Sequence, residues 1–396
     1  MSQVTPPKYI RQILFGLQAR GFAAYLVGGC VRDMIMEVTP NDWDICTSAL
    51  PEDVMDIFPG SRPTGLKHGT VTVVLGTKTA EVTTFRREGE YRDHRRPDAV
   101  SFVSDLITDL SRRDFTMNAI ALSADGMVSD PFDGITDIKN RTIRCVGDPL
   151  LRFEEDALRM FRALRFSARL GFTIEYETLG AIEQKAQLAS ELAPERVRDE
   201  LEKILLTPRP DTLGAAISFG MLSRYIPGTG WKTPNFANLA KLPKKPLSRW
   251  AAFSIMLQKY GFIPSVHDFL FSLRLDGRTM RCCEGASEIL RSPPPEDKLG
   301  WKKLLYRYGV DTVSCAVSAF EALSGQDLEK ELRAVLKSGE CFSMKHLAVN
   351  GDDLLELGLQ GHALGEMLEF LLEYVMEYPE NNRREILLSL AKPEDS

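Results

Sequence analysis

The seven cysteines of this sequence follow no regular spacing. They are odd in number, no two form a CxxC pair, and they stand at positions 30, 46, 145, 282, 283, 315 and 341. This scatter excludes a disulfide framework and a cysteine zinc site, and it predicts reduced thiols. Long apolar runs are also missing, since none reaches the about 18 residues that a membrane span needs. The first residues, MSQVTPPKYIRQ, contain no apolar signal core. We therefore expect a cytoplasmic protein without a membrane partner.

An excess of positive charge is missing as well. The 396 residues carry a formal net charge of −6, and 44% of them are hydrophobic and 26% charged. This is a globular composition, and the length predicts two to four domains. The charge is uneven: residues 311–396 hold 17 acidic and 7 basic side chains, and the remainder holds 38 and 42. An acidic total argues against broad non-specific nucleic-acid binding, but a basic groove in the first three quarters stays possible.

The spacing of apolar residues predicts an α+β fold. Residues 8–21 predict a helix, residues 51–57 a second one, and VVLGTKTAEV (73–82) predicts a hairpin among several short β-like runs. Residues 1–145 therefore predict an α+β head built on a small mixed β-sheet.

Beyond residue 146 almost only helical periodicity remains. Residues 151–172 predict one long helix, and proline-rich breaks separate further helical parts. We expect an all-α neck (146–210), body (211–310) and tail (311–396).

The stretch LVGGCVRDMIMEVTPNDWDICT (26–47) carries the first candidate site. An apolar run ends at Gly28 and Gly29, Arg32 follows, and Asp42 and Asp44 stand one residue apart. On a strand the two carboxylates would share a face and repel unless a cation lies between them. Mg²⁺ suits such hard oxygen ligands and commonly shares a substrate phosphate. The glycines leave room for a phosphate, and an arginine can pair with it.

A third acidic residue on a nearby strand would complete this site, and Glu81 is the candidate. Two metal ions held in this way can activate an attacking hydroxyl and stabilise a leaving pyrophosphate. The competing interpretations are an exposed Asp pair at a strand start and a half-exposed glutamate in a hairpin.

Six segments in order carry a family resemblance. GGCVRD and DWDICT are followed by RRDFTMNAIAL (112–122), DPFDG (130–134), EEDALRMFRALRFSARLGF (154–172) and ELAPERVRDELEKIL (191–205). Together they resemble the class II branch of the nucleotidyltransferase superfamily, which holds CCA-adding enzymes and bacterial poly(A) polymerases. The resemblance is strong over about residues 10 to 205 and looser beyond them.

The resemblance implies a role for each matching residue. Asp42 and Asp44 would hold two Mg²⁺ ions, and Glu81 would assist them. The implied nucleotide contacts are Gly28, Gly29 and Arg32 to the triphosphate; Arg113 to the bound nucleotide; Asp114 and Asn118 to the sugar; Asp156 and Arg159 to the base, with Glu155 orienting Arg159; and Arg162 and Arg165 to phosphate or primer.

The chemistry of the pair Asp156 and Arg159 agrees with this role. A carboxylate accepts and a guanidinium donates, so the pair matches the amino group and ring nitrogen that cytosine and adenine share. Guanine and uracil present the opposite pattern, and buried polar groups left unpaired give strong rejection. The competing interpretation is an ordinary surface ion pair between residues three apart on a helix.

The resemblance implies addition of the 3′-terminal CCA sequence to tRNA from CTP and ATP, without a nucleic-acid template. RREGEYRDHRRP (86–97) is similar to the flexible loop of relatives that add the terminal A, although a plain surface loop has the same composition. The alternatives are a poly(A) polymerase, an A-adding tRNA nucleotidyltransferase, and a non-catalytic RNA- or nucleotide-binding protein.

Two further segments bear on this interpretation. His267-Asp268 is interpreted as a helix start and not as a metal-dependent phosphohydrolase site, because the earlier histidines, 68 and 94, lie in the head. In the tail, Gln360-Gly361-His362 replaces the proline-containing turn of the family.

Overall fold

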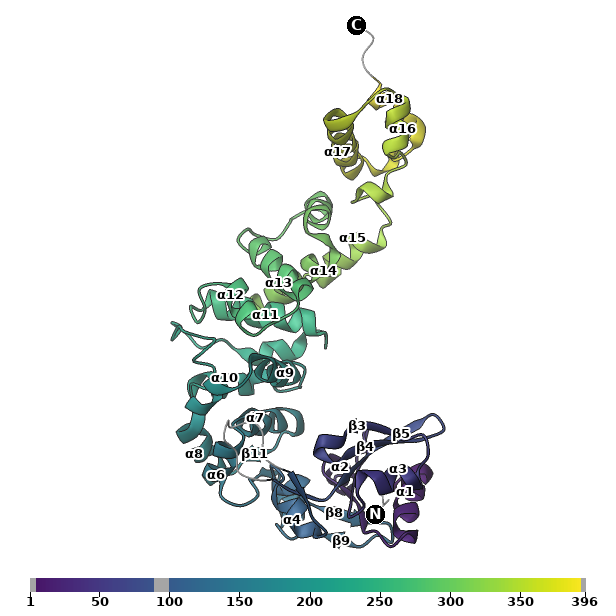
Figure 1. The fold of residues 1–396 in the computed structure, drawn as a ribbon. Helices are drawn as coiled ribbons and strands as arrows, with labels where there is room; N and C mark the ends of the chain where they lie inside the picture. The colour runs from purple at the N-terminus through teal and green to yellow at the C-terminus, as the bar shows by residue number, and fades with distance from the viewer. Residues whose placement is uncertain (1–4, 89–99, 393–396) are drawn as a thin grey trace. The chain divides into compact units, whose positions relative to one another are not determined.

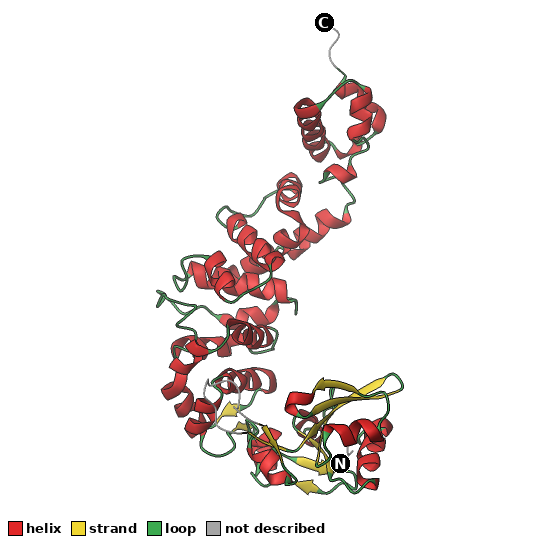
Figure 2. Ribbon diagram, viewed as in Figure 1, coloured by secondary structure: helices red, strands yellow, loops and turns green. Residues whose placement is uncertain are grey.

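The fold is that of a computed structural model, which describes residues 5–88 and 100–392. Its contacts divide the chain into two units, residues 1–224 and 225–396. All described strands lie in the first unit, and the described regular structure of the second is helical (Figures 1 and 2). The predicted α+β class, with a mixed sheet in the N-terminal part followed by helices, is confirmed.

A seven-stranded sheet forms the centre of the head. Its strand order is β3-β4-β5-β2-β1-β8-β9; β2 and β5 are parallel, and the other neighbours whose pairing is known are antiparallel. The strands are β1 (Ala24–Val27), β2 (Asp44–Thr47), β3 (Arg62–Gly65), β4 (Thr70–Leu75), β5 (Lys78–Thr84), β8 (Ala121–Ser123) and β9 (Val128–Ser129). β4 and β5 form the predicted hairpin, with Leu75 opposite Lys78.

Five helices accompany the sheet: α1 (Lys8–Ala19), α2 (Gly29–Ile35), α3 (Pro51–Ile57), α4 (Leu106–Ser111) and α5 (Gly134–Lys139). The predicted helices at residues 8–21 and 51–57 are confirmed as α1 and α3. β6 (Arg86–Glu88) and β7 (Val100–Phe102) pair as a separate ribbon. From residue 89 onward, the predicted flexible loop at 86–97 lies outside the described residues.

The rest of the first unit consists of helices and one short strand pair. Its elements are β10 (Thr142–Ile143), α6 (Pro149–Glu155), α7 (Leu158–Leu170), β11 (Thr173–Ile174), α8 (Tyr176–Lys185), α9 (Pro194–Leu205) and α10 (Leu213–Ser218). The prediction of one helix over residues 151–172 is wrong. α6 ends at Glu155 because Asp156 adopts an extended backbone (φ −143°, ψ 100°) and its carboxylate accepts a hydrogen bond from the N–H of Leu158 at the start of α7.

The second unit contains α11 (Pro246–Lys259), α12 (Val266–Ser272), α13 (Gly277–Ile289), α14 (Lys298–Ser324), α15 (Glu329–Lys337), α16 (Gly351–Glu356), α17 (Gly361–Glu377) and α18 (Arg384–Ala391). α14 is broken at Gly309, whose φ of 78° and ψ of 162° are not helical. The predicted boundary after residue 310 falls beside this break. The predicted domain limits stay predictions, since the contacts separate two units only.

Two sequence-based exclusions can be compared with the structure. All seven cysteines are buried and free, so they pack as small apolar side chains. Within residues 5–88 and 100–392, no helix is both long and apolar enough to cross a bilayer.

Candidate active site

The glycine turn and the acidic strand meet at one end of the sheet. β1 ends at Val27, and Gly28 follows with a positive φ of 75° that favours glycine. β2 lies antiparallel beside β1 and begins at Asp44, so its first residue lies next to that turn. A Cβ atom at Gly28 would lie 3.6 Å from Asp44 Oδ2 and 3.2 Å from Arg113 Nη1. The turn therefore brings backbone, carboxylate and guanidinium close together.

The two aspartates do not both lie on the strand. Asp42 is in the bend before β2, whereas Asp44 is its first residue. The alternation of faces nevertheless persists, because Trp43 between them is buried, Asp42 is exposed and Asp44 is half-buried. The prediction that both aspartates lie on the strand is thus wrong for Asp42, whereas the expected alternation with Trp43 is present.

Glu81 lies beside Asp44, because the two residues are paired in register across the parallel strands β2 and β5. Burial raises the pKa of Asp44, and the negative charges of Glu81 and Asp42 raise it further, although Arg113 opposes them. Such a carboxylate is stabilised in its charged form by a cation.

The donor chemistry at Asp42, Asp44 and Glu81 therefore fits a divalent metal. Within the described part of the chain, no three His, Cys, Asp or Glu side chains are gathered into a ready-made metal cluster. Asp42, Asp44 and Glu81 are thus not gathered into such a cluster, and the role of Glu81 as a third acidic group of a metal site stays a prediction.

Arg32 is buried and held by protein side chains. Its Nε and Nη2 donate to Asp33 at 2.9 and 2.6 Å, and its Nη1 donates to Asn118 Oδ1 at 2.8 Å. The guanidinium also lies over the ring of Phe166, 5.4 Å from the centroid. The structure thus brings Arg32 and Asn118 together. A triphosphate contact by Arg32 stays a prediction, and such a contact would have to share or replace these partners.

Asp114 joins the head to α7. Its Oδ2 accepts from Arg162 Nε at 2.8 Å and Nη2 at 2.5 Å, and its Oδ1 accepts from Asn118 Nδ2 at 3.1 Å. Burial alone would raise the pKa of Asp114, but the charge and hydrogen bonds of Arg162, with the hydrogen bond from Asn118, lower it to about 2. Three predicted nucleotide-binding residues, the ion pair of Asp114 and Arg162 and the amide of Asn118, therefore form one hydrogen-bonded network.

The predicted base-reading residues lie on both sides of the break between α6 and α7. Arg159 Nη1 donates to Glu155 Oε2 at 2.6 Å and Nη2 donates to the carbonyl of Arg112 at 3.1 Å. The expected contact between Glu155 and Arg159 is therefore present. Asp156 instead accepts from Arg196 Nη2 of α9 at 3.0 Å. The spacing of three thus does not place Asp156 and Arg159 in one ordinary helical pair, although both flank the same turn.

The side chain of Arg165 contacts α9. Its Nε donates to the buried Glu200 at 2.6 Å, and its guanidinium lies 4.3 Å from the centroid of the Phe166 ring. Arg162 and Arg165 are thus both in ion pairs with protein carboxylates. Their contacts to phosphate or primer stay predictions.

Three charged residues that hold the predicted site residues in place were not predicted from the sequence. Asp109 lies three and four residues before Arg112 and Arg113, so helical spacing was a usable local signal. Arg196 and Glu200 gave no such signal, because their partners are 40 and 35 residues away.

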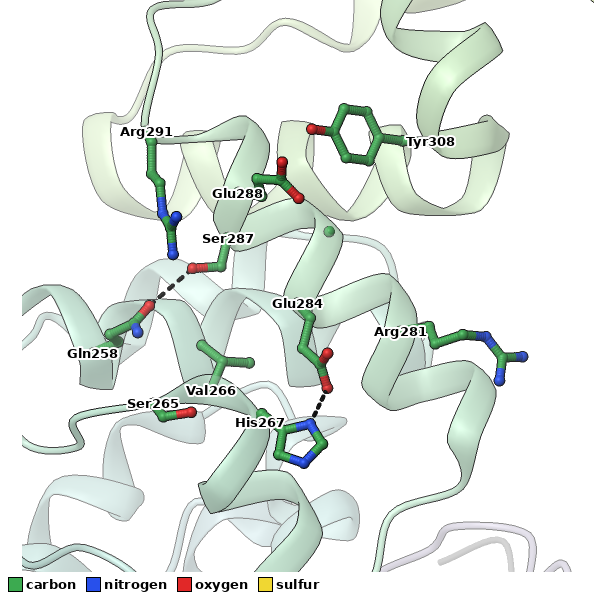
Figure 3. A pocket seen from close by; sticks show the side chains of 11 residues that line it. Gln258, Ser265, Val266, His267, Arg281, Glu284, Ser287, Glu288, Arg291 and Tyr308 are labelled. Carbon is green, nitrogen blue, oxygen red and sulfur yellow. Dashed lines mark hydrogen bonds and ion pairs between the residues drawn. The ribbon is translucent and has the colours of Figure 1, made fainter.

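The second unit contains no competing metal site among its described residues. A cavity of about 450 Å³ is lined there by residues of α11, α12, α13 and α14 and of the segments next to them. His267 lies on its wall and shares a hydrogen bond of 2.7 Å with Glu284 (Figure 3). Asp268 is in the first turn of α12, where its N–H donates to Ser265, as expected of a helix start.

Comparison with known proteins defines the class of this site. Residues 24–144 match the family described as Poly A polymerase head domain, and residues 171–230 match the family described as probable RNA and SrmB-binding site of polymerase A. A glycine turn beside the acidic start of a strand, in a head of this kind, defines a nucleotidyltransferase.

Proteins that are similar to this chain over nearly its whole length identify the family within this class. The chain is 39% identical over 391 residues to the CCA-adding enzyme of Limosilactobacillus fermentum, covering 96% of this chain and 95% of the relative. It resembles the crystal structure of Bacillus stearothermophilus CCA-adding enzyme in complex with CTP, with a TM-score of 0.81, 32% identity, and 98% and 97% of the two chains covered. The chain belongs to the family of CCA-adding enzymes, which are tRNA nucleotidyltransferases.

The same fold occurs in the Thermotoga maritima CCA-adding enzyme complexed with tRNA-CCA. That structure has a TM-score of 0.68 and 22% identity, and 98% and 96% of the two chains are covered. The predicted family and enzyme class are confirmed. Poly(A) polymerase, A-only addition and a non-catalytic binding protein are not favoured by these relatives.

Proposed function

We propose that this chain completes the 3′ end of tRNA by adding C, C and A from CTP and ATP, with release of pyrophosphate. Membership of the CCA-adding family supports the reaction, and the glycine turn beside Asp44 is the observation that supports a site in this head. A bond forms between the tRNA 3′ oxygen and the α-phosphorus, and the bond to the leaving pyrophosphate breaks. We place this activity in the cytoplasm.

Asp42 and Asp44 would hold two Mg²⁺ ions, with Glu81 beside them. When bound, these ions would lower the pKa of the attacking hydroxyl and neutralise charge on the phosphates. In support, burial and the charges of Glu81 and Asp42 raise the pKa of Asp44, so a cation at this position would stabilise its charged form.

Base selection would take place at the turn between α6 and α7. Arg159 is fixed by Glu155 and by the carbonyl of Arg112, so its guanidinium has few alternative positions. Asp156 is held by Arg196. A donor and an acceptor fixed on one turn could match cytosine or adenine and leave guanine or uracil mispaired.

The decisive experiment offers three tRNA transcripts, ending before CCA, after C and after CC, to the purified protein. We expect incorporation of C, C and A, of C and A, and of A, respectively, with no further extension. Incorporation of A without C into either of the first two transcripts, a long A tail on any transcript, or no incorporation at all would contradict the proposal.

The metal assignment has its own variant. Asp42→Ala should lower incorporation by more than about 100-fold, because a metal ligand is lost, whereas tRNA binding in a filter assay should be retained. Asp268→Ala is the matched control, since Asp268 lies at a helix start in the second unit. Turnover of Asp42→Ala within a few-fold of wild type would contradict the metal assignment.

A further inference from the structure

Asp109 is a fully buried carboxylate that connects three parts of the head. It lies in α4 with no exposed surface. Its Oδ1 accepts from Arg112 Nη2 at 2.8 Å and from the peptide N–H of Arg86 at 3.3 Å, and its Oδ2 accepts from Arg113 Nη2 at 3.1 Å. A buried charge of this kind is stable because two guanidinium groups and a peptide dipole surround it.

Arg113 has acidic groups on two sides. Its Nη2 is bonded to Asp109, while its Nη1 lies 3.2 Å from the Cβ position of Gly28. Asp44 Oδ2 lies 3.6 Å from that same position. The Nε atom of Arg113 is buried and has no hydrogen-bond partner within the described residues. The guanidinium is therefore held by one carboxylate while it faces another, at the glycine turn.

The position of Arg113 depends on this balance. If Asp109 lost its charge, the guanidinium would be attracted mainly by Asp44, because unlike charges this close attract strongly in a partly buried site. An Arg113–Asp44 ion pair would use the carboxylate that the proposed reaction needs. The same ion pair would also move Nη1 of Arg113 away from the glycine turn, where it is placed to contact an anionic group of the nucleotide.

We propose that Asp109 is a positioning residue of this enzyme, which holds Arg113 at the glycine turn and keeps it from pairing with Asp44. The proposal rests on the function proposed for Asp44. The bond from the Arg86 N–H to the same carboxylate makes the position of Arg113 depend also on the ribbon of β6 and β7. Asp109 touches neither of the base-reading residues Asp156 and Arg159 through its carboxylate.

The test replaces the charge and keeps the shape, with Asp109→Asn. We expect the KM for CTP and the KM for ATP to rise by the same factor, about tenfold, as is typical of losing one charge-assisted contact. The fall in kcat should be smaller, and the preference for C and A over G and U should not change. CTP binding without tRNA, measured by calorimetry, should weaken by a similar factor.

Asp137→Asn is the matched control. Asp137 is also a buried carboxylate of the head, and it accepts from Thr116 at 2.6 Å and from Arg144 at 3.2 Å. Its loss should lower the melting temperature without changing either KM. If Asp109→Asn behaves in the same way, its role is only structural and the proposal is wrong.

A double variant isolates the link to Arg113. In an Arg113→Ala background, Asp109→Asn should cause no further change in KM, because the group that Asp109 positions is absent. An equal effect in both backgrounds would overturn the proposal. If Asp109→Asn does not fold, Arg113→Lys replaces it as the test. One ammonium group cannot reach both Asp109 and the glycine turn, so the KM for CTP and ATP should rise. An unchanged KM in Arg113→Lys would then refute the proposal. Failure of wild-type incorporation would instead contradict the proposed function.

Discussion

Single side chains at this site act mainly by holding one another. Arg32 is held by Asp33 and Asn118, and Asp114 holds Arg162. Each buried charge thus has a partner of opposite sign, which is the condition under which charges persist inside a protein. The residues expected to meet the nucleotide therefore form a preorganised set, so that little ordering would be left for the moment of binding.

Asp114 should make the stability of the first unit depend on pH in the acid range. Its pKa in the folded protein is lowered to about 2, from an ordinary value of 3.8. The folded state therefore favours the charged form, and the resulting stabilisation is present above about pH 4 and is lost as the pH falls toward 2. A pKa that falls from 3.8 to about 2 corresponds to a full stabilisation of about 2.5 kcal/mol, most of which is lost by pH 2.

Urea unfolding of wild type and Asp114→Asn at several pH values measures this contribution. The difference in the free energy of unfolding should be largest above pH 4 and should shrink by about 2 kcal/mol as the pH approaches 2. A difference that does not change with pH would show that Arg162 does not stabilise the charged carboxylate.

Substitutions of Asp156 and of its partner Arg196 test the proposed role of Asp156 in base selection. Asp156→Ala should raise the KM for both nucleotides and reduce the preference for C and A, because the acceptor at the turn is lost. Arg196→Ala should give a weaker form of the same change, since it only frees Asp156. Incorporation of all four nucleotides from competing mixtures is the measurement. An Asp156→Ala enzyme that discriminates like wild type would refute the templating role.

At the scale of elements, the sequence predicted what local spacing determines. Helix α1, helix α3 and the hairpin of β4 and β5 follow from apolar periodicity and a glycine-containing turn. The break at Asp156 could not be predicted in this way, because apolar residues continue through it with helical spacing. Its causes are a side-chain cap on Leu158 and an ion pair to Arg196, 40 residues away.

For the candidate active site, too, the sequence did not predict contacts between residues that are far apart in the chain. The motif resemblance supplied Asp44, Asp114 and Arg159, but only coordinates show which partner each one takes. Arg165, expected at phosphate, pairs with Glu200 of α9, because that residue is buried and needs a counter-charge. Long-range partners of this kind leave no periodic trace in a single sequence.

The start of α5 offers a test of how tightly the elements of the head are packed. A Cβ atom at Gly134 would lie 2.2 Å from the backbone oxygen of Thr116, in the short turn that also carries Asn118. Backbone cannot yield as a side chain can, so Gly134→Ala should destabilise the first unit by about 3 kcal/mol or more and impair nucleotide binding.

Gly180→Ala is the matched control for this substitution. Gly180 lies inside α8 with nothing within 4 Å of its Cβ position, so alanine should be neutral or stabilise by up to about 1 kcal/mol. Thermal unfolding of both variants gives the comparison. Equal melting temperatures would mean that α5 is not packed closely against the Thr116 turn.

At the scale of the whole molecule, charge is distributed unevenly along the chain. Residues 311–396 carry about ten more acidic than basic side chains, and the remainder carries about four more basic than acidic. Backbone phosphates of tRNA should therefore be contacted mainly by the part before residue 311. In the second unit, Arg281 and Arg291 of the cavity region have no hydrogen-bond or ion-pair partner within the described residues, whereas Arg384 of the tail donates to Asp353 at 2.7 Å.

The salt dependence of tRNA binding tests this distribution. Each phosphate contact that a substitution removes should lower the slope of log Kd against log salt by about 1. Replacing Arg281 and Arg291 together by Gln should therefore reduce the slope by about 1 to 2, because two guanidinium groups are removed. Arg384→Gln should leave the slope unchanged, because that guanidinium already has a carboxylate partner. The opposite result, a lower slope for Arg384→Gln and an unchanged slope for the double variant, would contradict this expectation. It would mean that arginines of the acidic segment leave their carboxylate partners and bind tRNA phosphates.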